Sequence, residues 1–172
     1  TSDGFQVDAD VKVNTNTETY VSWNWKANGT GSSNTDGSIN TAATSANTTA
    51  GFSINTYTGT GSGATVGHGL GAVPGFIVIK NLSEIQDWRV YHDATAASPG
   101  TKNLVLNSNV VLNDDDDHFN DEDATSSVFS LGVNHGSNKS GDSLVAFVWA
   151  EVHMKVTEMP IVHLATQVLD QL

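Results

Sequence analysis

The fold is decided by residues 51–81, GFSINTYTGTGSGATVGHGLGAVPGFIVIKN, which contain the two clearest strand patterns of the chain. Residues 52–58 alternate with period two, as a strand with two different faces does. Residues 76–80 begin with the apolar, mostly β-branched run FIVI, which predicts a strand covered on both faces. A glycine-rich connection separates the two runs. We therefore expect these strands to lie in the core of one β domain.

The bulk composition agrees with a β domain. The 172 residues are enough for one domain with a real core. Abundant Ser, Thr, Asn and Gly favour strands joined by turns over long helices. The chain has no Cys, so it offers neither a disulfide nor a thiolate metal site. No apolar run approaches the ~20 residues of a membrane span, so we expect no membrane insertion.

The charge is strongly acidic. Seven basic residues face 19 acidic ones, which gives a formal charge of −12. Residues 113–123 alone contribute much of this excess, with the run NDDDDHFNDED. Such a surface repels phosphate backbones, so nucleic acid is not an expected partner.

Further strands are predicted outside the central stretch. Each of these ranges has an apolar or alternating pattern: 5–7, 20–25, 87–92, 103–106, 127–131 and 144–152. Residues 38–49 are small and Thr-rich, which fits an edge strand or a loop. Together these patterns predict an all-β fold, an antiparallel β-sandwich of jelly-roll type.

An internal repeat relates the two ends of the β region. Residues 3–27 match residues 127–151 at a constant offset of 124, without a gap. The matched pairs share their chemical class: Phe5 with Phe129, Val7 with Leu131, Asn14 with Asn138, Glu18 with Asp142, Val21 with Val145, Trp23 with Phe147, and Trp25 with Trp149. The loop residues match as well as the strand residues, so we interpret the similarity as a true repeat.

The repeat suggests a division into four segments. Residues 1–27 are interpreted as the closing hairpin of a preceding unit or as an exchange arm, and residues 28–36 as a linker. Residues 37–152 form the β-sandwich domain, and residues 153–172 a tail with the stripe of an amphipathic helix. The hairpin and the tail are the predicted assembly interface, through these apolar side chains: Phe5, Tyr20, Trp23, Trp25, Ile161, Leu164, Val168 and Leu169.

Long segments of the chain resemble a β domain of tail-fibre and other structural proteins of marine bacteriophages. They are YVSWNWKANGT, SNTDGSI, ANTTAGFSINTYTGTGSGATVGHGLGAVPGFIVIKN, WRVYH and VFSLGVNHGSNKSGDSLVAFVWAEV. In that family such units recur along long virion proteins. The resemblance implies a structural or attachment role in a virion or at an extracellular surface. It implies copies of the chain and other virion proteins as partners, and it brings no catalytic residues.

The acidic segment is the strongest metal candidate. Clustered carboxylates suit a hard cation such as Ca²⁺, and Asp115, Asp117 and Asp121 are the ligands we select. The EF-hand spacing is not met, because the sixth position from Asn113 is His118 rather than Gly. A solvated, mutually repelling loop is the alternative. No other cofactor is expected.

The remaining chemistry argues against an enzyme. The six His residues show no metal-binding spacing, and no G-x-S-x-G elbow or phosphate-binding loop is present. His68, between two glycines, is predicted to lie at a turn or an inter-strand contact.

Trp88, Arg89 and Tyr91 are the selected candidates for stacking and binding a host-surface glycan. Three hypotheses follow from the sequence. The first is a homo-oligomeric fibre-like protein, the second a carbohydrate-binding module, and the third a non-viral filament subunit assembled by strand exchange.

Overall fold

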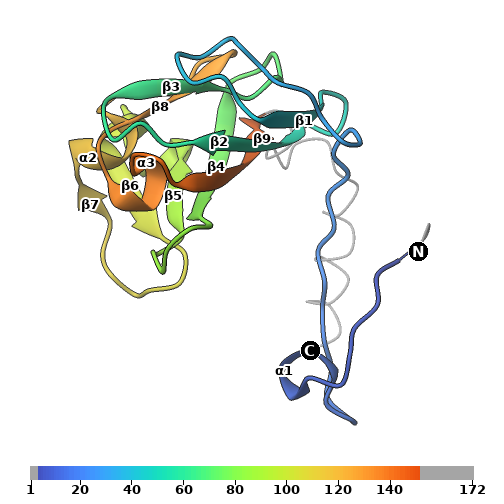
Figure 1. The fold of residues 1–172 in the computed structure, drawn as a ribbon. Helices are drawn as coiled ribbons and strands as arrows, with labels where there is room; N and C mark the ends of the chain where they lie inside the picture. Colours follow the sequence, from blue (N-terminus) through green and yellow to red (C-terminus); the bar gives the residue numbers. More distant parts are fainter. Residues whose placement is uncertain (1–3, 152–172) are drawn as a thin grey trace, which may run out of the picture.

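The strands form two antiparallel sheets in a computed structural model, which describes residues 4–151 (Figure 1). The larger sheet has seven strands in the order β1-β2-β9-β4-β5-β6-β7, and the smaller pairs β3 with β8. The strands span Ala43–Asn47 (β1), Phe52–Thr58 (β2), Ala64–Gly67 (β3), Pro74–Asn81 (β4), Arg89–His92 (β5), Lys102–Val105 (β6), Asn113–Asp114 (β7), Val128–Leu131 (β8) and Ser143–Ala150 (β9). The predicted all-β antiparallel sandwich is confirmed.

Strand β9 lies at the centre of the larger sheet. It pairs with β2 on one side and with β4 on the other, so both strands of the decisive stretch flank it. Leu144, Ala146 and Val148 face the smaller sheet and are fully buried. Phe147 and Trp149 alternate with them and face the opposite side of the sheet. An apolar run on both faces is therefore what this central position requires.

The core lies between the two sheets. The smaller sheet covers the inner face of the larger one, and its Val66, Phe129 and Leu131 are at most 1% exposed. The Tyr57 side chain lies in this core, and its hydroxyl donates to the carbonyl oxygen of Ser137 at 2.7 Å. Burial raises the pKa of Tyr57, so the hydroxyl stays protonated and remains a donor.

Short helical turns close the ends of the sandwich. They are α1 Val11–Asn14, η1 Asp93–Thr95, η2 Pro99–Thr101, α2 Asp116–Phe119 and α3 His135–Asn138. Turn α3 bridges β8 and β9, and α2 lies in the acidic segment. Gly132 fits against α2 because a Cβ there would lie 2.4 Å from the carbonyl oxygens of Asp116 and Asp117.

The glycine-rich connection is more structured than its composition indicated. Strand β3 lies inside it, and the sequence analysis did not predict this strand. His68 follows β3 and is fully buried. Its Nε2 lies 3.1 Å from the carbonyl oxygen of Thr125, and its Nδ1 accepts the amide of Leu70 at 3.2 Å. His68 therefore joins the β3–β4 turn to the segment that precedes β8.

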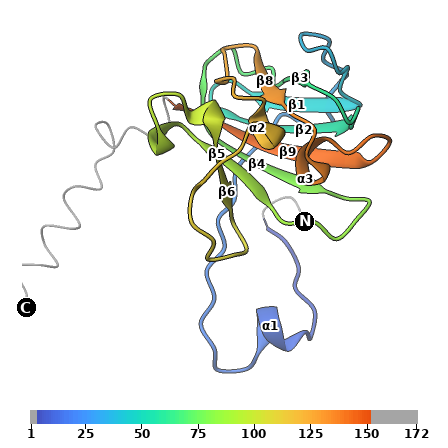
Figure 2. The same cartoon turned by 90° about the vertical axis from the view of Figure 1, so that its left-hand side faces the viewer.

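Two predicted strands are absent. Residues 5–7 and 20–25 are extended but pair with no strand among the described residues. They flank α1 in a long excursion that leaves the sandwich, as both views show (Figures 1 and 2). The prediction failed because strand-like residues need an edge to pair with, and the sandwich already has its own β8 and β9 in these roles. The predicted C-terminal helix lies outside the described residues.

Candidate assembly surfaces and a polar hollow

The outer face of the seven-stranded sheet is apolar and open. It carries a groove of about 510 Å³, lined by apolar and aromatic side chains of the sheet, its connections and the N-terminal segment: Trp23, Trp25, Ala50, Phe76, Val78, Trp88, Leu106, Phe147 and Trp149. We call it the outer groove. Strands β4 and β9 supply its floor, and the N-terminal segment supplies one wall. A contiguous apolar surface of this kind is typical of an interface.

An aromatic cluster forms one end of the outer groove. The ring of Trp149 lies 5.0 Å from that of Phe52 and 5.2 Å from that of Phe76, measured between centroids. Trp25 stands edge-on to Trp149 at 5.2 Å. This contact holds the end of the N-terminal segment against the sheet. The Trp149 indole Nε1 is buried without a hydrogen-bond partner among the described residues.

The predicted assembly residues of the N-terminal segment are exposed. Phe5 is 62% exposed, Trp23 74% and Trp25 53%, and Tyr20 is exposed as well. Trp23 and Trp25 line the outer groove, whereas Phe5 and Tyr20 do not. The other four predicted interface residues, Ile161, Leu164, Val168 and Leu169, lie outside the described residues.

A polar hollow lies at β5, on the other face of the seven-stranded sheet from the outer groove. Its volume is about 420 Å³, and six of its nine lining residues are polar: Arg89, Asn103, Val105, Val110, Val111, Asn113, Asp115, His118 and Asn134. We call it the Arg89 hollow. Three of its side chains bury polar atoms that lack a hydrogen-bond partner within the described residues, namely Arg89 Nε, Asn103 Oδ1 and both ring nitrogens of His118. Such atoms are uncommon in native proteins and call for a partner.

Electrostatics in the Arg89 hollow favour a neutral imidazole. Burial lowers the pKa of His118, and the nearby Arg89 guanidinium lowers it further. Asp115 and Asp117 oppose this effect. His118 Nδ1 lies 3.2 Å from Asp115 Oδ2, although the contact is not aligned as a hydrogen bond. The hollow thus presents donors and acceptors together, with the Arg89 guanidinium as its cationic group and the Asp115 carboxylate as its anionic group.

The predicted glycan trio does not form one site. Trp88 lines the outer groove, whereas Arg89 opens into the Arg89 hollow on the other side of the sheet. Tyr91 is 2% exposed and stacks edge-to-face on Phe119 in the core, with 5.5 Å between centroids. The prediction of one joint site is wrong because Trp88 and Arg89, as successive residues, face opposite sides, and Tyr91, on the same face as Arg89, is buried against Phe119.

The acidic segment brings two of the three predicted metal ligands together. Asp115, Asp116 and Asp117 can place one carboxylate oxygen each within 4.8 Å of one another, and Asp121 is not part of this group. Asp115 also caps α2, since its Oδ1 accepts the Asp117 amide at 2.9 Å. Its other oxygen accepts from Asn113 at 3.2 Å. Metal binding by Asp115 and Asp117 stays a prediction.

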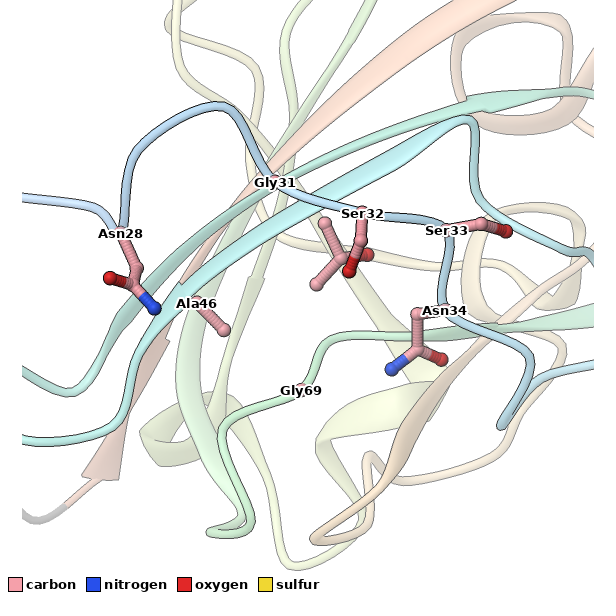
Figure 3. Close-up of a pocket in the computed structure, with 8 residues that line it drawn as sticks. Asn28, Gly31, Ser32, Ser33, Asn34, Ala46 and Gly69 are labelled. Carbon is pink, nitrogen blue, oxygen red and sulfur yellow. The ribbon is translucent and has the colours of Figure 1, made fainter.

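A second polar hollow opens beside β1 (Figure 3). It has a volume of about 440 Å³ and lies between residues 28–34, β1 and the turn at Gly69. Its Asn34 side chain is already engaged, because Oδ1 accepts the Asp36 amide at 2.9 Å and Nδ2 donates to the Asp36 carboxylate at 2.9 Å. Unlike the Arg89 hollow, it has no buried polar side-chain atom that lacks a hydrogen-bond partner among the described residues.

A comparison with known protein families identifies a match to this chain. A family model described as "Domain of unknown function (DUF7483)" matches residues 1–154. The chain belongs to the DUF7483 family. The matched region of DUF7483 includes both the N-terminal segment and the sandwich. Neither a curated protein nor a solved structure matches the chain.

Sequence reasoning missed both hollows and the extent of the outer groove in this DUF7483 chain. The groove had a signal, because Phe147 and Trp149 alternate with small apolar residues along a central strand. The Arg89 hollow had none, since its residues come from β5, β6, the β6–β7 connection, the acidic segment and the cap of α3. No helix within residues 4–151 is long and apolar enough to span a membrane.

Proposed function

We propose that this DUF7483 chain is a non-enzymatic structural or attachment protein of a fibre-like virion assembly, built from copies of the chain. The outer groove carries the proposal. An apolar strip on the outside of a central sheet is costly in water, and covering it with a second subunit removes that cost. The resemblance to bacteriophage tail-fibre domains and the internal repeat support the same conclusion.

Self-association is tested by sedimentation of the full chain over a range of concentrations. We expect concentration-dependent oligomers, and we expect Leu106→Glu, a change in the outer groove, to weaken them. Burying a charge and losing a leucine contact each cost about 2 kcal/mol, so the association constant should fall at least roughly tenfold.

Ile85→Glu is the matched control. Ile85 is fully exposed on the β4–β5 connection and does not line the outer groove. The substitution replaces an exposed apolar side chain by the same charged one, and we expect this variant to associate like the unaltered chain. A chain that stays monomeric at every concentration, or equal effects of both substitutions, would contradict the proposal. Antibody labelling of purified phage particles that encode the chain tests the virion location.

A second candidate function, glycan binding, is favoured by the Arg89 hollow. Arg89 Nε, Asn103 Oδ1 and the two ring nitrogens of the neutral His118 are buried donors and acceptors without a hydrogen-bond partner among the described residues, and a bound sugar would supply their partners. Neighbouring sugar hydroxyls present the same mixture of donors and acceptors. Aliphatic Val105 and Val110 offer an apolar wall for a sugar ring. On this hypothesis the attachment protein would contact a host-surface saccharide through Arg89 rather than through Trp88.

Nuclear magnetic resonance titration of the full chain with a panel of bacterial surface oligosaccharides tests this candidate. We expect shifts confined to residues of the Arg89 hollow and lost in Asn103→Ala. Shifts at Trp88 and the outer groove, or no shift with any oligosaccharide, would rule out this site.

A further inference from the structure

The N-terminal excursion repeats the local structure of the β8–β9 connection. Turn α1 spans Val11–Asn14 and turn α3 spans His135–Asn138, so the two turns are displaced by the same 124 residues as the sequence repeat. The structure thus places the same element at equivalent positions of two segments that lie in different environments. The α3 copy is packed in the sandwich, whereas the α1 copy is exposed.

The caps of the two turns are equivalent. Asp10 caps α1 at φ −66° and ψ 125°, and its side chain accepts the Lys12 amide at 2.8 Å. Asn134 caps α3 at φ −66° and ψ 135°, and its side chain accepts the Gly136 amide at 2.7 Å. Each bond has its counterpart 124 residues away. A β-sandwich does not require this match, because many loops can join two strands.

The side-chain bonds that close the two loops are also equivalent. Asn14 Nδ2 donates to the carbonyl oxygen of Asp8 at 2.6 Å. Asn138 Nδ2 donates to the carbonyl oxygen of Gly132 at 2.7 Å. In each loop this bond joins the last residue of the helical turn to the first residue of the loop, which follows residues 5–7 in one copy and β8 in the other.

The final turns agree in backbone conformation. Thr17 has φ 73° and Gly141, 124 residues later, has φ 82°. A β-branched residue rarely adopts a positive φ. Thr17 therefore keeps the loop conformation of the β8–β9 connection although its side chain disfavours it.

The flanks of the excursion hold the side chains of a closing hairpin without its pairing. Phe5 is 62% exposed where Phe129 of β8 is 1% exposed. Trp23 is 74% exposed where its counterpart Phe147 is partly buried on the sheet. The loop has formed, and the two strands that it should join have no edge to pair with among the described residues.

We propose that residues 4–27 take the β8–α3–β9 position in a second sandwich of the same fold; we call these residues the closing hairpin, although β8 and β9 belong to different sheets. In that position residues 5–7 pair with the partner's equivalent of β3. Residues 20–26 enter between the partner's equivalents of β2 and β4. This inference rests on the proposed assembly function and names its partner as another unit of this fold.

The inner face of the hairpin says which kind of unit it fits. The inward positions of β9 hold small or apolar residues, Leu144, Ala146, Val148 and Ala150. The hairpin holds Tyr20, Ser22, Asn24 and Lys26 there. Buried polar groups need hydrogen-bond partners, so the hairpin suits a unit whose inner face is more polar than that of this chain. The partner is a related unit of different sequence, and the hairpin does not displace β9 of its own sandwich.

Co-expression tests the hairpin with the full chain as donor. The acceptor is residues 28–126, the sandwich without its closing hairpin. The matched donor is the full chain with the four inward residues of β9 placed in the hairpin, Tyr20→Leu, Ser22→Ala, Asn24→Val and Lys26→Ala. We expect the acceptor to copurify one-to-one with this donor. We expect this copurification to be lost when the donor lacks residues 1–27, and to be weaker with the unaltered hairpin.

A second donor shows whether the acceptor can be completed at all. It carries a further copy of residues 128–151 in place of residues 4–27. Copurification with this donor and not with the matched donor overturns the proposal. If the acceptor copurifies with neither donor, one unit does not complete another, and the proposal is contradicted.

A loop exchange provides an independent measurement. In the full chain, residues 9–18 replace residues 133–142, which are equal in number, so that Gly132, where a side chain would meet α2, is kept. We expect cooperative unfolding to be kept, and to be lost when the same loop is inserted in reverse order. Equal behaviour of the two insertions overturns the structural equivalence. None of these outcomes depends on the outer groove, so a chain that self-associates but donates no hairpin refutes this inference alone.

Discussion

Asn138 offers the sharpest test of how the β8–α3–β9 segment is held in the sandwich. Its side chain is fully buried and makes three well-formed bonds. Nδ2 donates to the carbonyl oxygens of Gly132 and Ser62, both at 2.7 Å. Oδ1 accepts the amide of Thr60 at 2.8 Å. Asn138 therefore ties the β8–β9 connection to the connection between β2 and β3.

The cost of Asn138→Ala follows from these bonds. Each buried hydrogen bond contributes about 1 kcal/mol net, so the loss of three should cost about 3 kcal/mol. In a protein of this size 1 kcal/mol shifts the melting midpoint by about 2–4 °C, so the midpoint should fall by roughly 6–12 °C.

Asn14→Ala is the internal control. Asn14 makes the equivalent bond in the exposed copy of the loop, where water replaces a lost partner. We expect a cost of about 0.5 kcal/mol or less in the isolated chain. Urea unfolding followed by circular dichroism measures both variants. Equal costs, or a cost for Asn138→Ala below about 1 kcal/mol, would refute the argument that the two loops share a geometry but differ in packing.

Three further predictions concern the core. Gly132→Ala should cost about 3 kcal/mol by chemical denaturation, because the new Cβ would lie 2.4 Å from two carbonyl oxygens of α2; an unchanged midpoint would contradict this packing. Tyr57→Phe should cost about 1–2 kcal/mol, since it leaves the buried Ser137 carbonyl without its donor; a cost near zero would count against that bond. Burial lowers the pKa of His68 in the folded state, so below about pH 6.5 the unfolded chain binds the extra proton first. Stability should therefore fall as the pH drops from 7 to 5, and His68→Gln should reduce this slope in denaturation curves taken across that range. An identical slope in the variant would argue against a buried neutral imidazole.

The strands with strong periodicity could be predicted from the sequence. The run at residues 52–58 coincides with β2, and FIVI lies within β4, because alternation and β-branching directly reflect the faces of a sheet. Strand β3 could not be predicted in this way. Its four residues lie among glycines, and its pairing with β8 depends on a segment more than 60 residues away.

The N-terminal segment shows the opposite error. Residues 20–25 have the pattern of a strand, yet a strand forms only where an edge is available. The repeat at offset 124 still carried correct information, because the loop of the excursion reproduces the loop that contains α3. Local hydrogen bonds suffice for the loop, whereas the strands require long-range partners. The Arg89 hollow could not be foreseen, since it is assembled from several parts of the chain between β5 and α3.

The central claim is that residues 4–27 are a folded loop with two unpaired strands that become paired in an assembly. Hydrogen–deuterium exchange of the full chain, dilute and in its assembled form, tests it most directly. We expect amides 20–26 to exchange freely in the dilute chain, while those of β9 are protected. In an assembly that contains the partner unit, amides 20–26 should gain protection like that of β9. An assembly in which these amides still exchange freely would contradict the claim.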